Sequence, residues 1–129
     1  MKKDLDSIIL TRQELQIMKV VWDRREATVK EVWSVITLKK PTAYTTILTL
    51  MGILEDKGAL DHLRAGRAYV YRPLLSQEQA TRNQVEDLIR RFFDGKPEKL
   101  IETLVNTHVT EPEQINNLKM LVQSMHQFA

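Results

Sequence analysis

Hydrophobic positions in the first part of the chain recur at intervals of three or four residues, which is the spacing of amphipathic helices. Three such stretches follow one another, and we predict helices over residues 12–23, 29–38 and 43–57. The first two begin with capping boxes, in which a Thr side chain and a Glu three residues later each satisfy a backbone N–H. Thr42 is expected to cap the third helix, and Gly58 to end it with a left-handed conformation.

Two short stretches after the third helix have the composition of strands. Residues 59–64 and 68–72 are expected to pair through Ala65-Gly66-Arg67, where Gly supplies the positive φ of a tight hairpin. Tyr69-Val70-Tyr71 favours β structure. The uneven alternation of the first stretch predicts a bulge or a short first strand. Three helices followed directly by a hairpin are typical of a winged helix-turn-helix domain.

Three further amphipathic helices are predicted after residue 76. So small a unit buries three apolar faces poorly by itself, and pairing with a second copy is the common solution. Packing back onto the first part is the alternative. We therefore expect a mainly α protein with a small β-hairpin, divided into a winged helix over 1–75 and a helical dimerisation region over 76–129. The residues expected at the dimer interface are Val85, Leu88, Ile89, Phe92, Leu100, Leu104, Ile115, Leu118, Leu121 and Val122.

The composition excludes several classes of function. The 129 residues include no Cys, so disulfides and thiolate sites are absent, and the three His lack the spacing of metal ligands. Phosphate-binding Gly motifs and nucleophile motifs are also missing. We expect no enzymatic activity, no metal and no cofactor. Without a signal sequence or an apolar run of membrane-spanning length, the chain is expected to be cytoplasmic and to have no membrane partner.

Charge is distributed unevenly along the chain. Residues 1–75 hold 13 Lys and Arg against 9 Asp and Glu, whereas residues 76–129 hold 6 against 8. A basic first part and an acidic second part fit a nucleic-acid reader joined to a unit with another role. So small an asymmetry also fits chance scatter, so charge alone does not decide the function.

The outer face of the predicted third helix is small and hydroxylated, with Thr45, Thr49 and Gly52 opposite the apolar residues and Thr46 beside them. An exposed Gly inside a helix costs about 1 kcal/mol relative to Ala, and close approach of another molecule explains it. Thr hydroxyls and methyls contact bases in the major groove, although a single exposed Thr also fits an ordinary helix surface. The cations expected on phosphates are Lys39, Lys40, Arg64 and Arg67.

Several sequence segments together resemble the penicillinase-repressor (BlaI/MecI) family. They are Leu10-Thr11…Glu14…Met18…Trp22, Ala43-Tyr44-Thr45-Thr46-Ile47…Thr49, Lys57-Gly58 and Gly66-Arg67-Ala68-Tyr69-Val70-Tyr71-Arg72-Pro73. The resemblance covers about residues 8–128 and is densest over 41–73. It implies a bacterial repressor that binds pseudo-palindromic operator DNA as a homodimer. It also implies that the start of the third helix reads DNA, here through Tyr44, Thr45, Thr46 and Thr49, with the wing around Arg67.

The resemblance also implies a β-lactam response, in which a membrane-bound sensor protease cuts the dimerisation region of family members. The best-known members are cut at an Asn-Phe bond, whereas the matching place here reads Thr103-Leu104. A copper-responsive branch senses through C-terminal Cys pairs, which this chain lacks. Two alternatives remain at this point: a winged helix used for protein interaction, and a repressor released by a small ligand in an apolar pocket between the domains.

Overall fold

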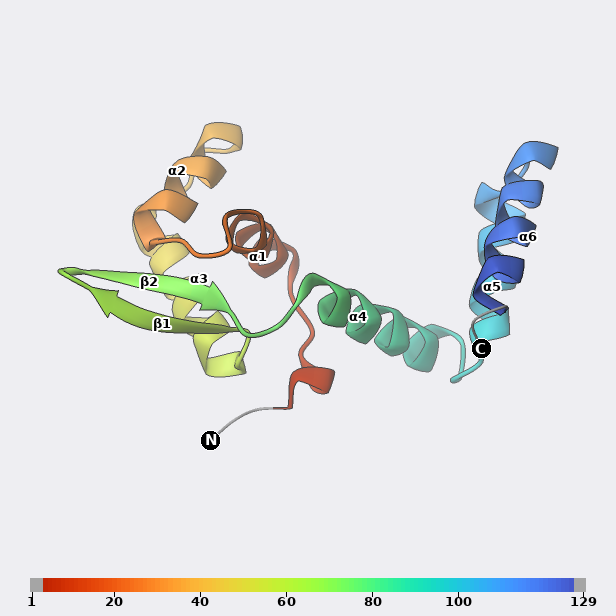
Figure 1. The fold of residues 1–129 in the computed structure, drawn as a ribbon, viewed down its shortest axis with the longest axis horizontal. Coiled ribbons are helices and arrows are strands. Elements are labelled where there is room, and N and C mark those ends of the chain that lie inside the picture. Colours follow the sequence, from red (N-terminus) through yellow and green to blue (C-terminus); the bar gives the residue numbers. More distant parts are fainter. Residues whose placement is uncertain (1–3, 127–129) are drawn as a thin grey trace. The chain divides into compact units, whose positions relative to one another are not determined.

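The computed structural model describes residues 4–126 (Figure 1). The chain is mainly helical with one antiparallel hairpin, which confirms the expected fold class. The elements are η1 (Leu5–Ser7), α1 (Arg12–Arg24), α2 (Val29–Lys39), α3 (Tyr44–Lys57), β1 (Leu60–Ala65), β2 (Ala68–Pro73), α4 (Gln77–Phe92), α5 (Pro97–His108) and α6 (Pro112–His126). None of the helices within residues 4–126 has the length and hydropathy needed to cross a membrane.

The chain forms two compact units, residues 1–85 and residues 86–129. The first unit therefore includes the start of α4. Asn83 explains this, because its buried side chain donates to the carbonyls of Leu5 (2.7 Å) and Ile8 (2.9 Å). The predicted roles of residues 1–75 in DNA binding and of residues 76–129 in dimerisation concern function and stay predictions.

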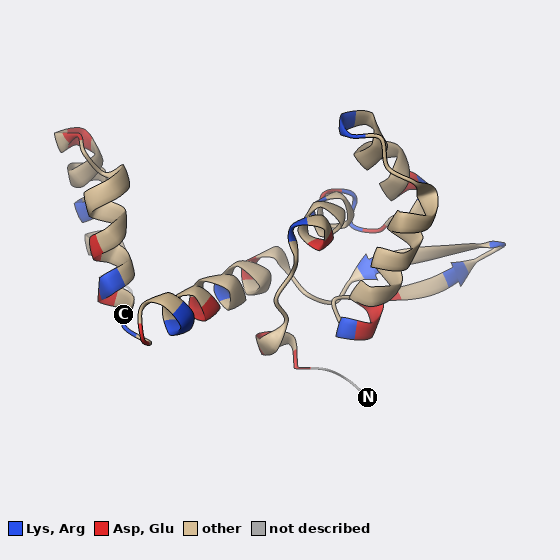
Figure 2. Ribbon diagram, turned by 180° about the vertical axis from the view of Figure 1, so that it is seen from behind, with Lys and Arg blue, Asp and Glu red and all other residues tan. Residues whose placement is uncertain are grey.

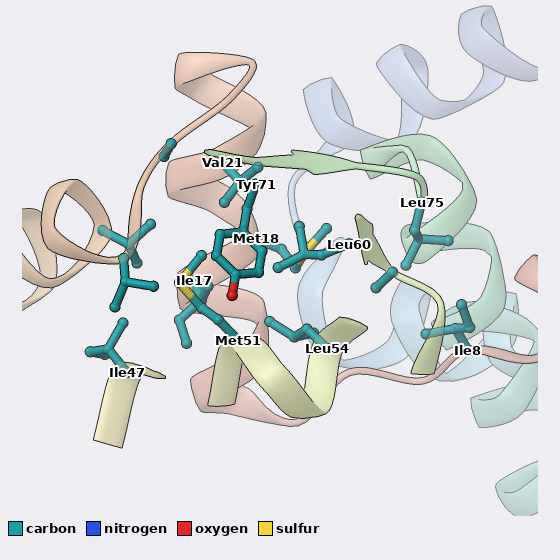
Figure 3. Close-up of a cluster of buried hydrophobic side chains, with 14 residues drawn as sticks. Ile8, Ile17, Met18, Val21, Ile47, Met51, Leu54, Leu60, Tyr71 and Leu75 are labelled. Carbon is teal, nitrogen blue, oxygen red and sulfur yellow. The ribbon is translucent and has the colours of Figure 1, made fainter. Parts of the chain in front are cut away.

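The core of the first unit lies between α1, α2, α3 and the base of the hairpin (Figure 3). The apolar face predicted for α3 is confirmed, with Ile47, Met51 and Leu54 almost fully buried and Leu50 packed against them. Met18 of α1 and Leu60 of β1 are equally buried. The other members of the core are Ile8, Ile17, Val21, Ala27, Val29, Val32, Ala59, Tyr71 and Leu75.

The capping boxes predicted at Thr11 and Thr28 are confirmed. Thr11 Oγ1 accepts from the Glu14 amide at 3.2 Å, and the Glu14 carboxylate accepts from the Thr11 amide at 2.8 Å. Thr28 and Glu31 repeat this arrangement at the start of α2, at 3.1 and 2.9 Å. These reciprocal bonds satisfy amides that the first turn of each helix leaves unpaired.

The hairpin pairs without interruption from Leu60 opposite Pro73 to Ala65 opposite Ala68, so the expected bulge or short first strand is wrong. Only the base of the hairpin is buried, and the strands therefore need no strict alternation towards the tip. Gly66 turns the chain with a φ of +64°. Tyr71 exchanges backbone hydrogen bonds with Ala27, at 2.9 and 2.8 Å, which fixes the hairpin to the loop between α1 and α2.

Candidate nucleic-acid interface

The start of α3 differs from the prediction, because Thr42 does not cap this helix. The N-cap residue is Ala43, and no side chain accepts a hydrogen bond from the first turn. Thr42 is occupied elsewhere, because its hydroxyl donates to the Lys40 carbonyl at 2.8 Å and its carbonyl accepts from the Trp33 indole N–H at 2.7 Å. The free amides and the helix dipole make this end of α3 attractive to an anion.

The outer face of α3 is largely exposed to solvent. Tyr44, Thr45, Thr46 and Thr49 are all exposed. A Cβ built on Gly52 would meet no atom within 4 Å. The packing of the protein itself therefore gives no reason for a Gly at this position.

The four predicted phosphate-contacting cations lie at two places in the first unit. Lys39 ends α2 and Lys40 follows it, both exposed. Arg64 and Arg67 lie at the tip of the hairpin, where Arg64 Nε donates to the Gly66 carbonyl at 3.2 Å. Figure 2 shows basic positions at the end of α2 and along the hairpin.

Two contacts hold α3 at its ends. At the start, the rings of Trp33 and Tyr44 meet edge to face with centroids 6.0 Å apart. At the end, Lys57 Nζ lies 2.7 Å from Glu14 Oε1, and Glu14 is almost fully buried. The face of α3 that the sequence predicts to contact DNA thus belongs to a helix whose two ends are held by residues of α2 and α1.

A link between α3 and the hairpin was not predicted from the sequence. His62 Nδ1 of β1 lies 2.5 Å from Glu55 Oε2 of α3, and the His62 ring packs on the rings of Tyr69 and Tyr71. Burial, followed by the nearby Glu55 carboxylate, raises the pKa of the Tyr71 phenol. Tyr69 and Tyr71 of β2 were the sequence signal that could have indicated the position of His62, because aromatic side chains favour stacking with a ring on the paired strand.

The residues predicted at a dimer interface lie on α4, α5 and α6. Leu88, Ile89, Leu100 and Leu118 are half-buried. Exposed members are Val85 (40%), Phe92 (67%), Leu104 (45%), Ile115 (39%), Leu121 (57%) and Val122 (59%). No residue from 86 to 125 is fully buried. The second unit thus leaves most of its apolar side chains in contact with solvent.

In the part of the chain that the structure describes, acidic and histidine side chains show no arrangement suited to a metal. Within residues 4–126 no group of three or more His, Asp or Glu side chains is placed to hold one ion. The geometry offers instead an exposed helix face, a hairpin with cationic tip residues and an uncapped helix start. These features suit contact with a polyanion.

Known proteins resemble this chain in sequence and in fold. The model of the family described as penicillinase repressor matches residues 10–124. A penicillinase repressor of Bacillus licheniformis is 26% identical over 110 residues, which cover 85% of this chain and 86% of that protein. The methicillin resistance regulatory protein MecI of Staphylococcus aureus is 20% identical over 113 residues, which cover 88% of this chain and 92% of that protein.

A solved structure connects the fold to DNA. The Bacillus licheniformis BlaI monomeric form, in complex with the blaP half-operator, is 32% identical to this chain with a TM-score of 0.50. The match covers 61% of this chain and 93% of that one. The resemblance found in the sequence is confirmed, and the chain belongs to the penicillinase repressor family.

Proposed function

We propose that this chain is a homodimeric transcriptional repressor that occupies a pseudo-palindromic operator. In this proposal α3 enters the major groove and the hairpin lies on the DNA backbone. The observation that supports it most strongly is the outer face of α3. This face carries exposed threonines, and the space beside the Cα of Gly52 is open. A surface that the protein does not use for its own packing is available for a groove of DNA.

The chemistry of this face fits base contacts. The hydroxyls of Thr45, Thr46 and Thr49 can donate to or accept from base edges, and their methyls can contact the thymine methyl. Tyr44 adds an exposed phenol at the helix start. Leu48, which is 46% exposed on the same helix, adds an apolar contact. Because threonine is a weaker base reader than bidentate Arg or Asn, sequence choice also depends on DNA shape and on half-site spacing.

Phosphate contacts supply the affinity in this proposal. Lys39 and Lys40 reach the backbone beside the start of α3, and Arg64 and Arg67 reach it from the hairpin. The free amides at the start of α3 add an anion-binding group. Binding through these groups weakens as salt rises, because each neutralised phosphate releases counterions.

Pairing of two copies places two winged-helix domains on one operator. The exposed apolar side chains of α4, α5 and α6 supply the surface, because burial of apolar area drives association. Two copies of α3 then lie in successive major grooves about 34 Å apart. The structure of the monomeric BlaI form on a half-operator supports one copy per half-site.

Release from DNA belongs to the C-terminal region in this proposal, with proteolysis by a sensor protease as the route typical of the family. Thr103 and Leu104, at the place of the cut in relatives, are exposed but lie inside α5. A protease needs an extended segment, so cleavage here requires local unfolding of α5. The names of the relatives, a penicillinase repressor and a methicillin resistance regulatory protein, support a β-lactam response.

Selection of DNA by the full chain tests this function. The chain is incubated with duplexes of randomised sequence, and the retained duplexes are sequenced after several rounds at rising salt. We expect enrichment of a two-fold symmetric sequence whose affinity falls steeply with salt. A pool that stays random, with retention independent of salt, would contradict the repressor and favour a winged helix used for protein interaction.

A further inference from the structure

A cleft of about 890 Å³ lies in the first unit, between α1, the end of α2 and the start of α3. This volume is within the range of pockets that hold small organic ligands, roughly 300–1,000 Å³. The cleft is not part of the outer face of α3 described above, but it shares an edge with it at Thr46.

The floor of the cleft is apolar. The floor consists of the most buried lining residues, Ile17 and Ile47, which are almost fully buried. Further apolar side chains along the walls are only half-buried: Val20, Trp22, Val35, Ile36 and Leu50. Half-buried apolar groups gathered in one concave place gain stability when an apolar ligand removes them from water.

The rim of the cleft is strongly basic. Arg12, Lys19, Lys39 and Lys40 line it, and none of them forms an ion pair among residues 4–126. Arg24 also lines the cleft but is paired with Glu31 on α2 at 2.8 Å. Asp23 is the one carboxylate among the described residues that line the cleft.

We propose that this cleft binds a small amphipathic carboxylate, with its apolar body on the floor and its anionic head at the basic rim. An apolar floor alone would take a neutral hydrocarbon, and a basic rim alone would take an inorganic anion. The two together favour a molecule that carries both features, because each part then meets its complement. A medium-chain fatty acid such as decanoate has this chemistry.

Occupation of the cleft opposes DNA binding, and this part of the inference rests on the proposed function. Lys39, Lys40 and Thr46 belong both to the cleft lining and to the proposed DNA-contacting residues. A bound carboxylate neutralises positive charge that would otherwise contact the phosphates of DNA. By linkage, the carboxylate and the operator then weaken the binding of each other by the same factor.

Binding is tested first without DNA. Full-length protein labelled with ¹⁵N is titrated with decanoate below its micelle concentration, and with decanol as the neutral analogue. We expect shifts at residues of the cleft, including the Trp22 indole N–H, and an affinity for decanol at least about tenfold weaker because the charged contacts are lost. Shifts confined to α5 and α6, where exposed apolar side chains also lie, would overturn the site.

Two double variants distinguish binding at the basic rim from a general effect of the positive charge of the protein. Arg12→Gln combined with Lys19→Gln should weaken decanoate binding at least about tenfold by removing two charge-assisted contacts. Lys30→Gln combined with Arg82→Gln removes the same charge from exposed positions outside this cleft and should leave binding unchanged. Equal affinity in the two double variants would overturn the assignment of the carboxylate to the rim.

The effect on DNA is tested with the duplex selected above. Saturating decanoate should weaken binding of that duplex about tenfold and make the salt dependence shallower by about one to two phosphate contacts. The Arg12→Gln, Lys19→Gln variant should bind the duplex as the control does and should need at least about tenfold more decanoate for the same loss of DNA affinity. Unchanged DNA binding at full occupancy would overturn the antagonism. Decanoate binding in the cleft without selection of any duplex would contradict the proposed function and support the site.

Discussion

Glu14 Oε1 lies 2.7 Å from Lys57 Nζ, which joins the first turn of α1 to the last turn of α3. Lys57 Nζ also donates to the Ile9 carbonyl at 3.2 Å. Burial by itself would raise the pKa of Glu14, but the hydrogen bonds from Lys57 and Thr11 and the charge of Lys57 hold that pKa below its ordinary value of 4.5. The pair therefore fixes one end of the proposed reading helix.

Replacing Lys57 should destabilise the fold in a way that depends on pH. We expect Lys57→Met to lower the free energy of unfolding by about 2 kcal/mol at neutral pH, because the buried Glu14 carboxylate loses its cation. The pKa of Glu14 is lowered in the folded state, so the stabilisation is present above 4.5 and is lost as the pH falls through the folded pKa. Denaturant titrations across this range measure it.

The matched control for this pair is Lys30→Met, which removes an exposed lysine of α2. It should change the free energy of unfolding by less than about 0.5 kcal/mol at any pH. A Lys57→Met penalty that persists unchanged well below pH 4.5 would show that the lysine stem, and not the ion pair, stabilises the fold.

Gly52→Ala should separate stability from DNA binding. The new methyl group meets open space, so the helix gains up to about 1 kcal/mol of stability. The same methyl group obstructs close approach of DNA to the backbone of α3, so affinity for the selected operator should fall at least about tenfold. Thermal unfolding and gel shift measure the two effects. Thr81→Ala, on the exposed surface of α4, should leave operator affinity unchanged.

Arg67→Ala should weaken DNA binding equally for all sequences. A lost phosphate contact reduces the slope of log affinity against log salt by about one. Arg82→Ala is the matched control, because Arg82 is exposed on α4 away from the hairpin. Equal slopes for Arg67→Ala and the wild-type chain would remove Arg67 from the interface.

Leu121→Asp should convert a dimer into a monomer. Leu121 is 57% exposed within one chain, so the substitution should cost the isolated fold little, whereas a charge at a buried interface is costly. Sedimentation should show a single chain, and operator affinity should fall because two half-sites are no longer engaged together. Asn117→Asp on the same helix is the control. A Leu121→Asp protein that still sediments as a dimer would exclude this face.

Local chemistry explains which parts of the fold could be predicted. The capping boxes at Thr11 and Thr28 involve residues three positions apart, so the sequence alone contains them. The apolar spacing of Ile47, Met51 and Leu54 likewise predicted the buried face of α3. Helix ends and helix faces follow from neighbours in the chain.

Contacts between elements could not be predicted in this way. The indole of Trp33 occupies the Thr42 carbonyl, and Thr42 therefore does not cap α3 as a local pattern predicts. The link from Glu55 to His62 depends on how the hairpin returns towards α3. Each of these contacts is set by tertiary packing, which overrides a local preference.

Thr49 offers the most direct test of α3 as the reading helix, because it is exposed and contributes nothing to the core. Thr49→Phe should fold, sediment as the wild-type chain does, and lose at least about a hundredfold in affinity for the selected operator, since a bulky ring obstructs the groove contact. Thr81→Phe carries the same substitution on α4 and should bind normally. A gel shift in which Thr49→Phe retains full affinity would contradict the placement of α3 in the major groove.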